Sequence, residues 1–150
     1  MYHTIVKRIV RKNFLRVNQK DFNALLKDCA PDIRHRFGGT HALGGERRDR
    51  AAFALWCERL GRLGKHLTLT VSDIWVTGWP HDTTAIVRWS ATDVLPDGLP
   101  YANRGVHIIK MKWGKVVEID AHEDSQAVVN NLARQAVLGI VEATAPAIVS

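Results

Sequence analysis

Hydrophobic and polar residues alternate along most of residues 66–122, and this period of two is the feature that most restricts the fold. Side chains on a β-strand point alternately to the two faces of a sheet, so each alternating segment predicts a strand with one buried face. Short turns containing glycine separate the segments, and such turns join antiparallel neighbours. The sequence therefore predicts an antiparallel meander of four strands: 66–77, 83–94, 102–112 and 115–122.

The apolar parity changes within the first of these strands. Leu69 and Val71 share one parity, whereas Ile74 and Val76 share the other. One extra residue in a strand reverses the faces that its side chains occupy, so we expect a β-bulge near Ser72. A bulge at this point would bend the sheet.

Helical spacing of hydrophobic residues appears before and after the predicted meander. Residues 4–17 place apolar side chains on one face and basic side chains on the other, which predicts an amphipathic helix. Asp21 and Asp49 are suited to cap two further helices. Asp124 or Ser125 is suited to cap a last helix over about residues 125–143.

A short strand and a loop are expected between the second and third helices. Residues 32–37 alternate strictly, and His35 lies on the apolar side of that segment. Glycines make residues 38–45 a loop, which contains His41. We expect the charged residues 46–50 to form the solvent-exposed start of the third helix.

Length, composition and charge exclude several classes of protein. The 150 residues, 46% hydrophobic and 24% charged, predict one ordinary folded domain over residues 1–150. The net charge of +6 comes from residues 1–20, which hold six of the 21 basic residues and no acidic one, so the other 15 basic residues balance the 15 acidic ones. We therefore expect no specific nucleic-acid partner. No apolar run has the length of a spanning helix and the first residues do not resemble a signal peptide, so we expect no membrane partner and a cytoplasmic location.

The cysteines and histidines lack the spacing of a metal site. Cys29 and Cys57 stand alone in the sequence, so we expect small buried side chains rather than a disulfide or a zinc ligand pair. The histidines are scattered along the chain without a ligand motif. We expect neither a metal nor a cofactor.

The element order, with three helices and a strand before four antiparallel strands, is typical of an α+β fold. The chain resembles the SnoaL-like polyketide cyclase family of the nuclear-transport-factor-2-like superfamily. The resemblance implies a cone-shaped, curved antiparallel sheet with helices enclosing a cavity on its concave face, usually in a homodimer. It lies in the order and spacing of five stretches: 32–39 (DIRHRFGG), 43–49 (LGGERRD), 85–90 (AIVRWS), 104–108 (RGVHI) and 114–118 (GKVVE).

The resemblance also implies a site, although its superfamily includes isomerases, cyclases, epoxide hydrolases, dehydratases and non-catalytic subunits. Family members with cyclase activity place a histidine on the third meander strand and an aspartate fourteen residues later, as acid/base partners. His107 matches that histidine, but the position fourteen residues on is Ala121. The neighbouring acid is Asp120, which we take as the conditional partner of His107 in catalysis.

The turn at residues 113–114 decides whether His107 and Asp120 share a face. A two-residue turn would place His107 opposite Asp120 and form an acid/base pair. A three-residue turn with a bulge would place His107 opposite Ile119 and turn Asp120 away from the cavity. The apolar parity around Ile119 slightly favours the second register.

Several other residues are candidates for contact with a ligand. His35 is expected to orient a ligand oxygen, although a core histidine bonded to the backbone is the alternative. Aromatic side chains are the other candidates, although such residues also fill ordinary cores. They are Phe37, Trp56, Trp89 and Tyr101.

Two functions remain open. The first is binding of an apolar or polycyclic small molecule, with isomerisation, cyclisation or hydration by cofactor-independent acid/base chemistry. The second is a non-catalytic ligand-binding or interaction module that has lost the family's acid at Ala121. In either case we expect a homodimer, formed through an apolar patch on the outer face of the sheet at Trp75, Val87 or Trp89.

Overall fold

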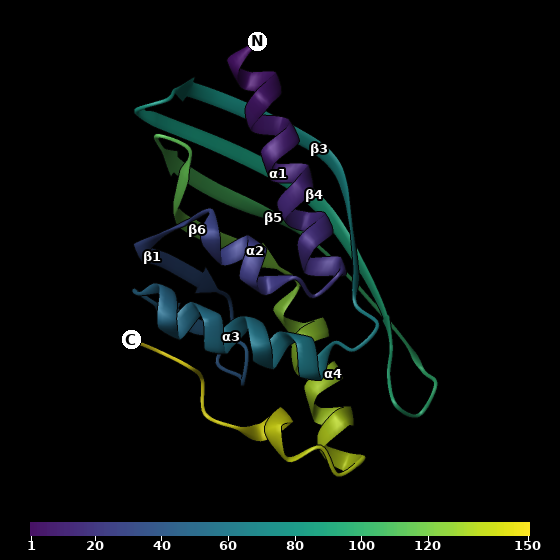
Figure 1. The fold of residues 1–150 in the computed structure, drawn as a ribbon. Coiled ribbons are helices and arrows are strands. Elements are labelled where there is room, and N and C mark those ends of the chain that lie inside the picture. The colour runs from purple at the N-terminus through teal and green to yellow at the C-terminus, as the bar shows by residue number, and fades with distance from the viewer.

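A computed structural model describes all 150 residues and has the α+β fold expected from the sequence (Figure 1). Four α-helices, one short 3₁₀ helix and six strands follow one another along the chain. Their bounds are α1 Tyr2–Asn18, α2 Phe22–Lys27, β1 Cys29–Phe37, β2 Gly45–Arg47, α3 Arg50–Leu63, β3 Thr68–Trp79, β4 Asp82–Val94, β5 Pro100–Lys112, β6 Lys115–Glu123, α4 Ser125–Val137 and η1 Val141–Thr144.

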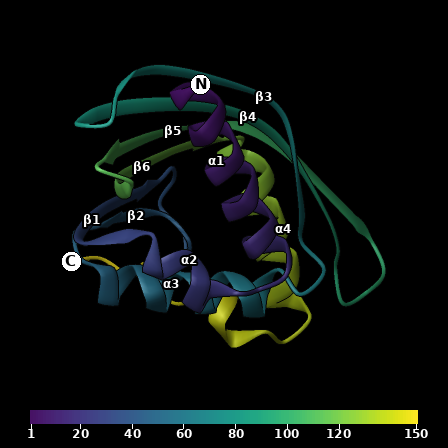
Figure 2. The same cartoon turned by 45° about the horizontal axis from the view of Figure 1, so that its top comes forward.

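The six strands form a single curved sheet in the order β2-β1-β6-β5-β4-β3. The predicted meander is present as β3 to β6, and only β1 and β6 pair in parallel. The helices lie along the concave side of this sheet, with α1 crossing it and α2 and α3 below (Figure 2). This arrangement places the inner face of the sheet opposite three helices.

Local signals in the sequence position the helices and the bend as predicted. The carboxylates of Asp21, Asp49 and Asp124 each accept hydrogen bonds from backbone N–H groups in the first turn of α2, α3 and α4. The pairing of β3 with β4 shifts by one residue between Val71 and Asp73, which confirms the expected bulge.

Several boundaries differ from the sequence prediction; β1, for example, begins at Cys29 rather than at residue 32. The last helix ends at Val137 rather than near residue 143, because Gly139 takes a positive φ of 90° and the chain turns before η1. The expected loop at 38–45 ends in β2, whose three residues pair with the end of β1. A strand this short shows too little alternation to be recognised in the sequence.

The concave face of the sheet is buried and the convex face is partly apolar. Val87 and Trp89 lie on the concave face, 0% and 5% exposed, so the prediction that they form an outer patch was wrong. Trp75 and Ile86 pair across β3 and β4 on the convex face and are 48% and 37% exposed. The bulge in β3 and the alternation of β4 together set these faces.

Helix α1 has the two faces that its pattern predicts. Val6, Val10 and Phe14 are buried against the sheet, whereas its basic side chains from Lys7 to Lys12 face outward. None of the helices combines the length and the hydropathy that crossing a membrane requires.

Candidate functional site

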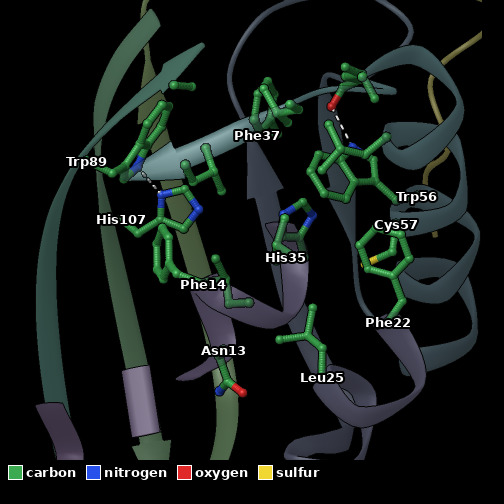
Figure 3. Close-up of a pocket in the computed structure, with 18 of the residues that line it drawn as sticks. Asn13, Phe14, Phe22, Leu25, His35, Phe37, Trp56, Cys57, Trp89 and His107 are labelled. Carbon is green, nitrogen blue, oxygen red and sulfur yellow. Dashed lines mark hydrogen bonds between the residues drawn. The ribbon is translucent and has the colours of Figure 1, made fainter. Parts of the chain in front are cut away.

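A cavity of about 140 Å³ lies between the concave face of the sheet and helices α1 to α4. Hydrophobic side chains from all these elements form most of its wall. Figure 3 shows the imidazoles of His107 and His35 on opposite sides of this space. Six of the residues predicted from the sequence line it: His35, Phe37, Trp56, Trp89, Tyr101 and His107.

His107 is held by a hydrogen bond from a tryptophan. The indole Nε1–H of Trp89 donates to Nδ1 of His107 over 2.6 Å, and Phe14 packs edge-on against the imidazole at 5.4 Å between ring centroids. Because Nδ1 accepts the hydrogen bond from Trp89, the neutral ring of His107 carries its proton on Nε2. This nitrogen is on the side of the cavity (Figure 3). Burial lowers the pKa of His107 to about 4, so the ring is neutral at pH 7.

A glycine makes room for this tryptophan. Gly105 pairs with Trp89 across β4 and β5, and a Cβ atom at Gly105 would lie 2.6 Å from the Trp89 ring and 2.3 Å from the carbonyl oxygen of His122. No side chain fits at that distance. Gly105 therefore leaves room for the indole to pass close to β5 and reach His107.

The β5–β6 hairpin has neither of the two registers considered from the sequence. Its turn has two residues, Trp113 and Gly114, both with positive φ, and Lys112 pairs with Lys115. The register then shifts between Lys110 and Met111, because β6 has one extra residue there. As a result His107 lies opposite Ala121, not opposite Asp120 or Ile119.

Asp120 is on the outer face of the sheet, away from His107. Its carboxylate Oδ2 lies 3.1 Å from His122 Nε2 and 3.8 Å from Arg36 Nη1. Ala121, which is 2% exposed, occupies the inward position beside His107. The structure therefore does not bring His107 and Asp120 together as an acid/base pair.

His35 is the second imidazole of the cavity and is 2% exposed. Its ring packs against Phe53 and Trp56, with centroids 4.5 Å and 4.3 Å apart, and its Nδ1 has no hydrogen-bond partner. Burial, and then the charge of Arg47, lower the pKa of His35 well below its usual value. His35 is therefore also neutral at pH 7, and Nδ1 lacks the backbone partner that the alternative, a core histidine, would have.

The end of the cavity that lies beyond Trp89, away from the two imidazoles, is polar. The hydroxyl of Tyr101 accepts a hydrogen bond of 2.8 Å from Asn103 Nδ2, and its pKa is raised by burial. Asp93 pairs with Tyr101 across β4 and β5 and is the one carboxylate in the wall of the cavity. Asp93 is four residues along β4 from Trp89, which is about 13 Å on a strand.

Arg47 is a buried charge that the sequence prediction missed. Residues 46–50 were expected to be solvent-exposed, but Arg47 is 0% exposed, because β2 turns Glu46 outward and Arg47 inward. Its guanidinium lies over Trp56, with Cζ 5.5 Å from the ring centroid. The only signal for this burial in the sequence is that Arg47 is the middle residue of three that would alternate between the two faces of a strand after Gly45.

The other reactive side chains are not arranged for metal or thiol chemistry. Cys29 and Cys57 are free thiols in the cavity wall, and burial raises the pKa of Cys29 to about 12 and that of Cys57 further. No three His, Cys, Asp or Glu side chains are grouped in a way that could hold a metal ion. His41 lies outside the cavity and accepts a hydrogen bond from the backbone of Leu43.

A sequence model of the SnoaL-like domain matches residues 10–119. No curated protein matches the chain in sequence. Among solved structures, the NTF2-like protein of unknown function from Burkholderia pseudomallei has a TM-score of 0.73 at 16% identity, covering 83% of this chain and 94% of its own.

Two further solved structures have similar folds. Bal32a, from a soil-derived mobile gene cassette, has a TM-score of 0.68 at 15% identity, covering 78% of this chain and 87% of its own. TerC, co-crystallised with polyporic acid, has a TM-score of 0.66 at 16% identity, covering 79% of this chain and 90% of its own. These likenesses extend over most of both chains and confirm the cone-like α+β fold.

Proposed function

This chain belongs to the SnoaL-like domain family, and on that premise we propose that it is a ligand-binding protein that holds one small apolar molecule in its cavity. The observation that carries the proposal is the neutral imidazole of His107, which presents Nε2–H to a mostly hydrophobic cavity. A ligand with an apolar ring and one oxygen acceptor matches both features.

The size of the cavity limits the ligand. A dry apolar cavity of about 150 Å³ holds a molecule as large as benzene, and this cavity is about 140 Å³. One ring with a short substituent fits this space, whereas a polycyclic ligand is larger than the cavity. The similar fold of TerC, crystallised with polyporic acid, supports an organic ligand in this scaffold.

The geometry around His107 fits ligand binding better than it fits acid/base catalysis. Isomerisation or cyclisation needs a group that accepts a proton from the ligand. Nδ1 of His107 is occupied by Trp89, and the inward position of the family's acid is Ala121. His107 is therefore suited to donate a hydrogen bond to a ligand oxygen rather than to remove a proton.

Binding of acetophenone, an aromatic ketone, tests this proposal against ethylbenzene, which has a similar shape but no carbonyl group. We expect calorimetry to show that the wild type prefers acetophenone by about fivefold, the contribution of one hydrogen bond. His107→Leu should remove the preference, because the donor is lost. Asp120→Asn, on the outer face, should keep it. Equal affinity of the wild type for the two probes would contradict the assigned role of His107.

The convex face supports a homodimer as part of the same proposal. Trp75, Ile86 and Ile108 follow one another across three adjacent strands of that face, and the first two are partly exposed. A contiguous apolar surface of this kind is usually covered in a soluble protein.

Solution scattering at micromolar concentration should therefore give the mass of a dimer. Ile86→Asp should shift the protein to a monomer, because it places a charge within the contact. Thr92→Asp, which adds the same charge further along β4, should leave the dimer intact. A monomeric wild type would reject the dimer without affecting the proposed cavity.

A further inference from the structure

Arg47 is a buried cation without a carboxylate partner. It is 0% exposed, and its Nε and Nη1 atoms have no hydrogen-bond acceptor, while Nη2 donates to the carbonyl oxygens of Gly44 and Gly45. The acids nearby are engaged elsewhere: Glu46 pairs with arginines on the outer face, and Glu142 pairs with Arg59 and Arg62. Buried charges in proteins are normally paired, so an uncompensated one indicates a missing anion.

Arg47 and His35 are neighbours. They are paired residues of β2 and β1, and both pack against Trp56. Each has buried nitrogen atoms without a hydrogen-bond partner. On Arg47 these are the donors Nε and Nη1, and on His35 the atom is Nδ1. The charge of Arg47 acts on the imidazole, since it contributes to lowering the pKa of His35.

The structure shows no direct hydrogen bond between these two groups, but one bridging water that donates to His35 Nδ1 and accepts from Arg47 would satisfy both. The neutral ring of His35 then carries its proton on Nε2, as the ring of His107 does under the donor Trp89. The two imidazoles face each other across the cavity (Figure 3). That end of the cavity would offer two N–H donors and a nearby positive charge.

No acid opposes this charge at the same end. The thiols of Cys29 and Cys57 remain protonated, because burial raises the pKa of each. Asp93 and the phenol of Tyr101 lie at the far end of the cavity, beyond Trp89. The electrostatics therefore favour a negatively charged ligand atom between His35 and His107.

We propose that the ligand is a small organic anion, a phenolate or a carboxylate on a single ring, whose charged oxygen accepts from His35 and His107 while Arg47 supplies the countercharge. This inference rests on the proposed binding function. It adds the charge of the ligand, which the family assignment and the cavity volume leave open.

4-Nitrophenol tests the inference, because its phenolate absorbs visible light and the phenol does not. Titrated with the full-length wild type, the bound probe should ionise at a pH at least one unit below that of the free probe, which means about tenfold tighter binding of the anion. Benzoate should also bind more tightly than benzamide, which has the same shape without the charge. A bound probe that ionises at or above its free pKa would overturn the inference.

Two variants locate the source of the effect. Arg47→Met should abolish the shift in ionisation while acetophenone still binds, whereas Arg36→Met, which removes the same charge from the outer face, should keep the shift. If Arg47→Met fails to fold, the wild-type titration still decides. If acetophenone binds but 4-nitrophenol shows no preference for its anion, the inference about ligand charge is rejected and the proposed binding function stands. If neither acetophenone nor 4-nitrophenol binds, the proposed function is rejected as well.

Discussion

Replacing Ala121 by aspartate should raise the pKa of His107 from about 4 to between about 5 and 7. The reason is the register, which places position 121 directly opposite His107 on the concave face. A carboxylate within about 4 to 6 Å of an imidazole favours its charged form by one to three pKa units. A shift of three pKa units corresponds to an increase of about a thousandfold in the affinity of the His107 ring for a proton.

The measurement is an NMR titration of the histidine side chains in the wild type and two variants. Ala121→Asn is the matched control, because it has nearly the same shape without the charge, and it should leave the pKa of His107 near the wild-type value. Equal pKa values in the Asp and Asn variants would show that position 121 does not face His107. The same Asp variant would carry the acid that family cyclases place there, so it is also the variant to examine for gained acid/base activity.

The second large effect is a loss of stability in mild acid. His107 has a pKa of about 4 in the folded protein and about 6.5 when unfolded, so between these values the unfolded chain binds more protons. Stability is complete above pH 6.5 and falls as the pH decreases toward 4. His107 alone should remove about 2 kcal/mol of unfolding free energy between pH 7.5 and pH 5. His35, whose pKa is also lowered, acts in the same direction.

Urea denaturation at the two pH values measures this loss. His107→Gln keeps an acceptor for the Trp89 indole but does not titrate, so its loss between pH 7.5 and pH 5 should be smaller by about 2 kcal/mol. His122→Gln, on the exposed outer face, should behave as the wild type. A His107→Gln variant with the full acid sensitivity would place the responsible group elsewhere.

Local patterns in the sequence predict most of this fold. The period-two alternation from residue 66, the capping aspartates and the change of parity near Ser72 each depend on nearby residues, and the structure agrees with all of them. Cavity-lining positions such as His35 and Trp56 were also found, because they lie on the apolar faces of a strand and a helix.

The errors arise where one residue depends on a distant strand. The extra residue in β6 changes the partner of His107, and the parity around Ile119 favoured a bulge in this hairpin but did not place it beyond the turn, within β6. Alternation along β4 places Val87 and Trp89 on one face and Arg88 on the other, and the expectation of a dimer patch wrongly turned that apolar face outward, whereas the helices cover it. Arg47 was missed because burying an arginine depends on β1 and Trp56, which are not adjacent to it in sequence.

The central claim is that His107 donates from Nε2 to a ligand in the cavity. The most direct test is a nitrogen-15 NMR spectrum of the histidine side chains at pH 7 during titration with acetophenone. We predict a neutral His107 with its proton on Nε2, and a saturable shift of the Nε2 resonance that Asp120→Asn does not alter. A His107 that is charged at pH 7, or protonated on Nδ1, or unchanged at millimolar acetophenone, would contradict the account.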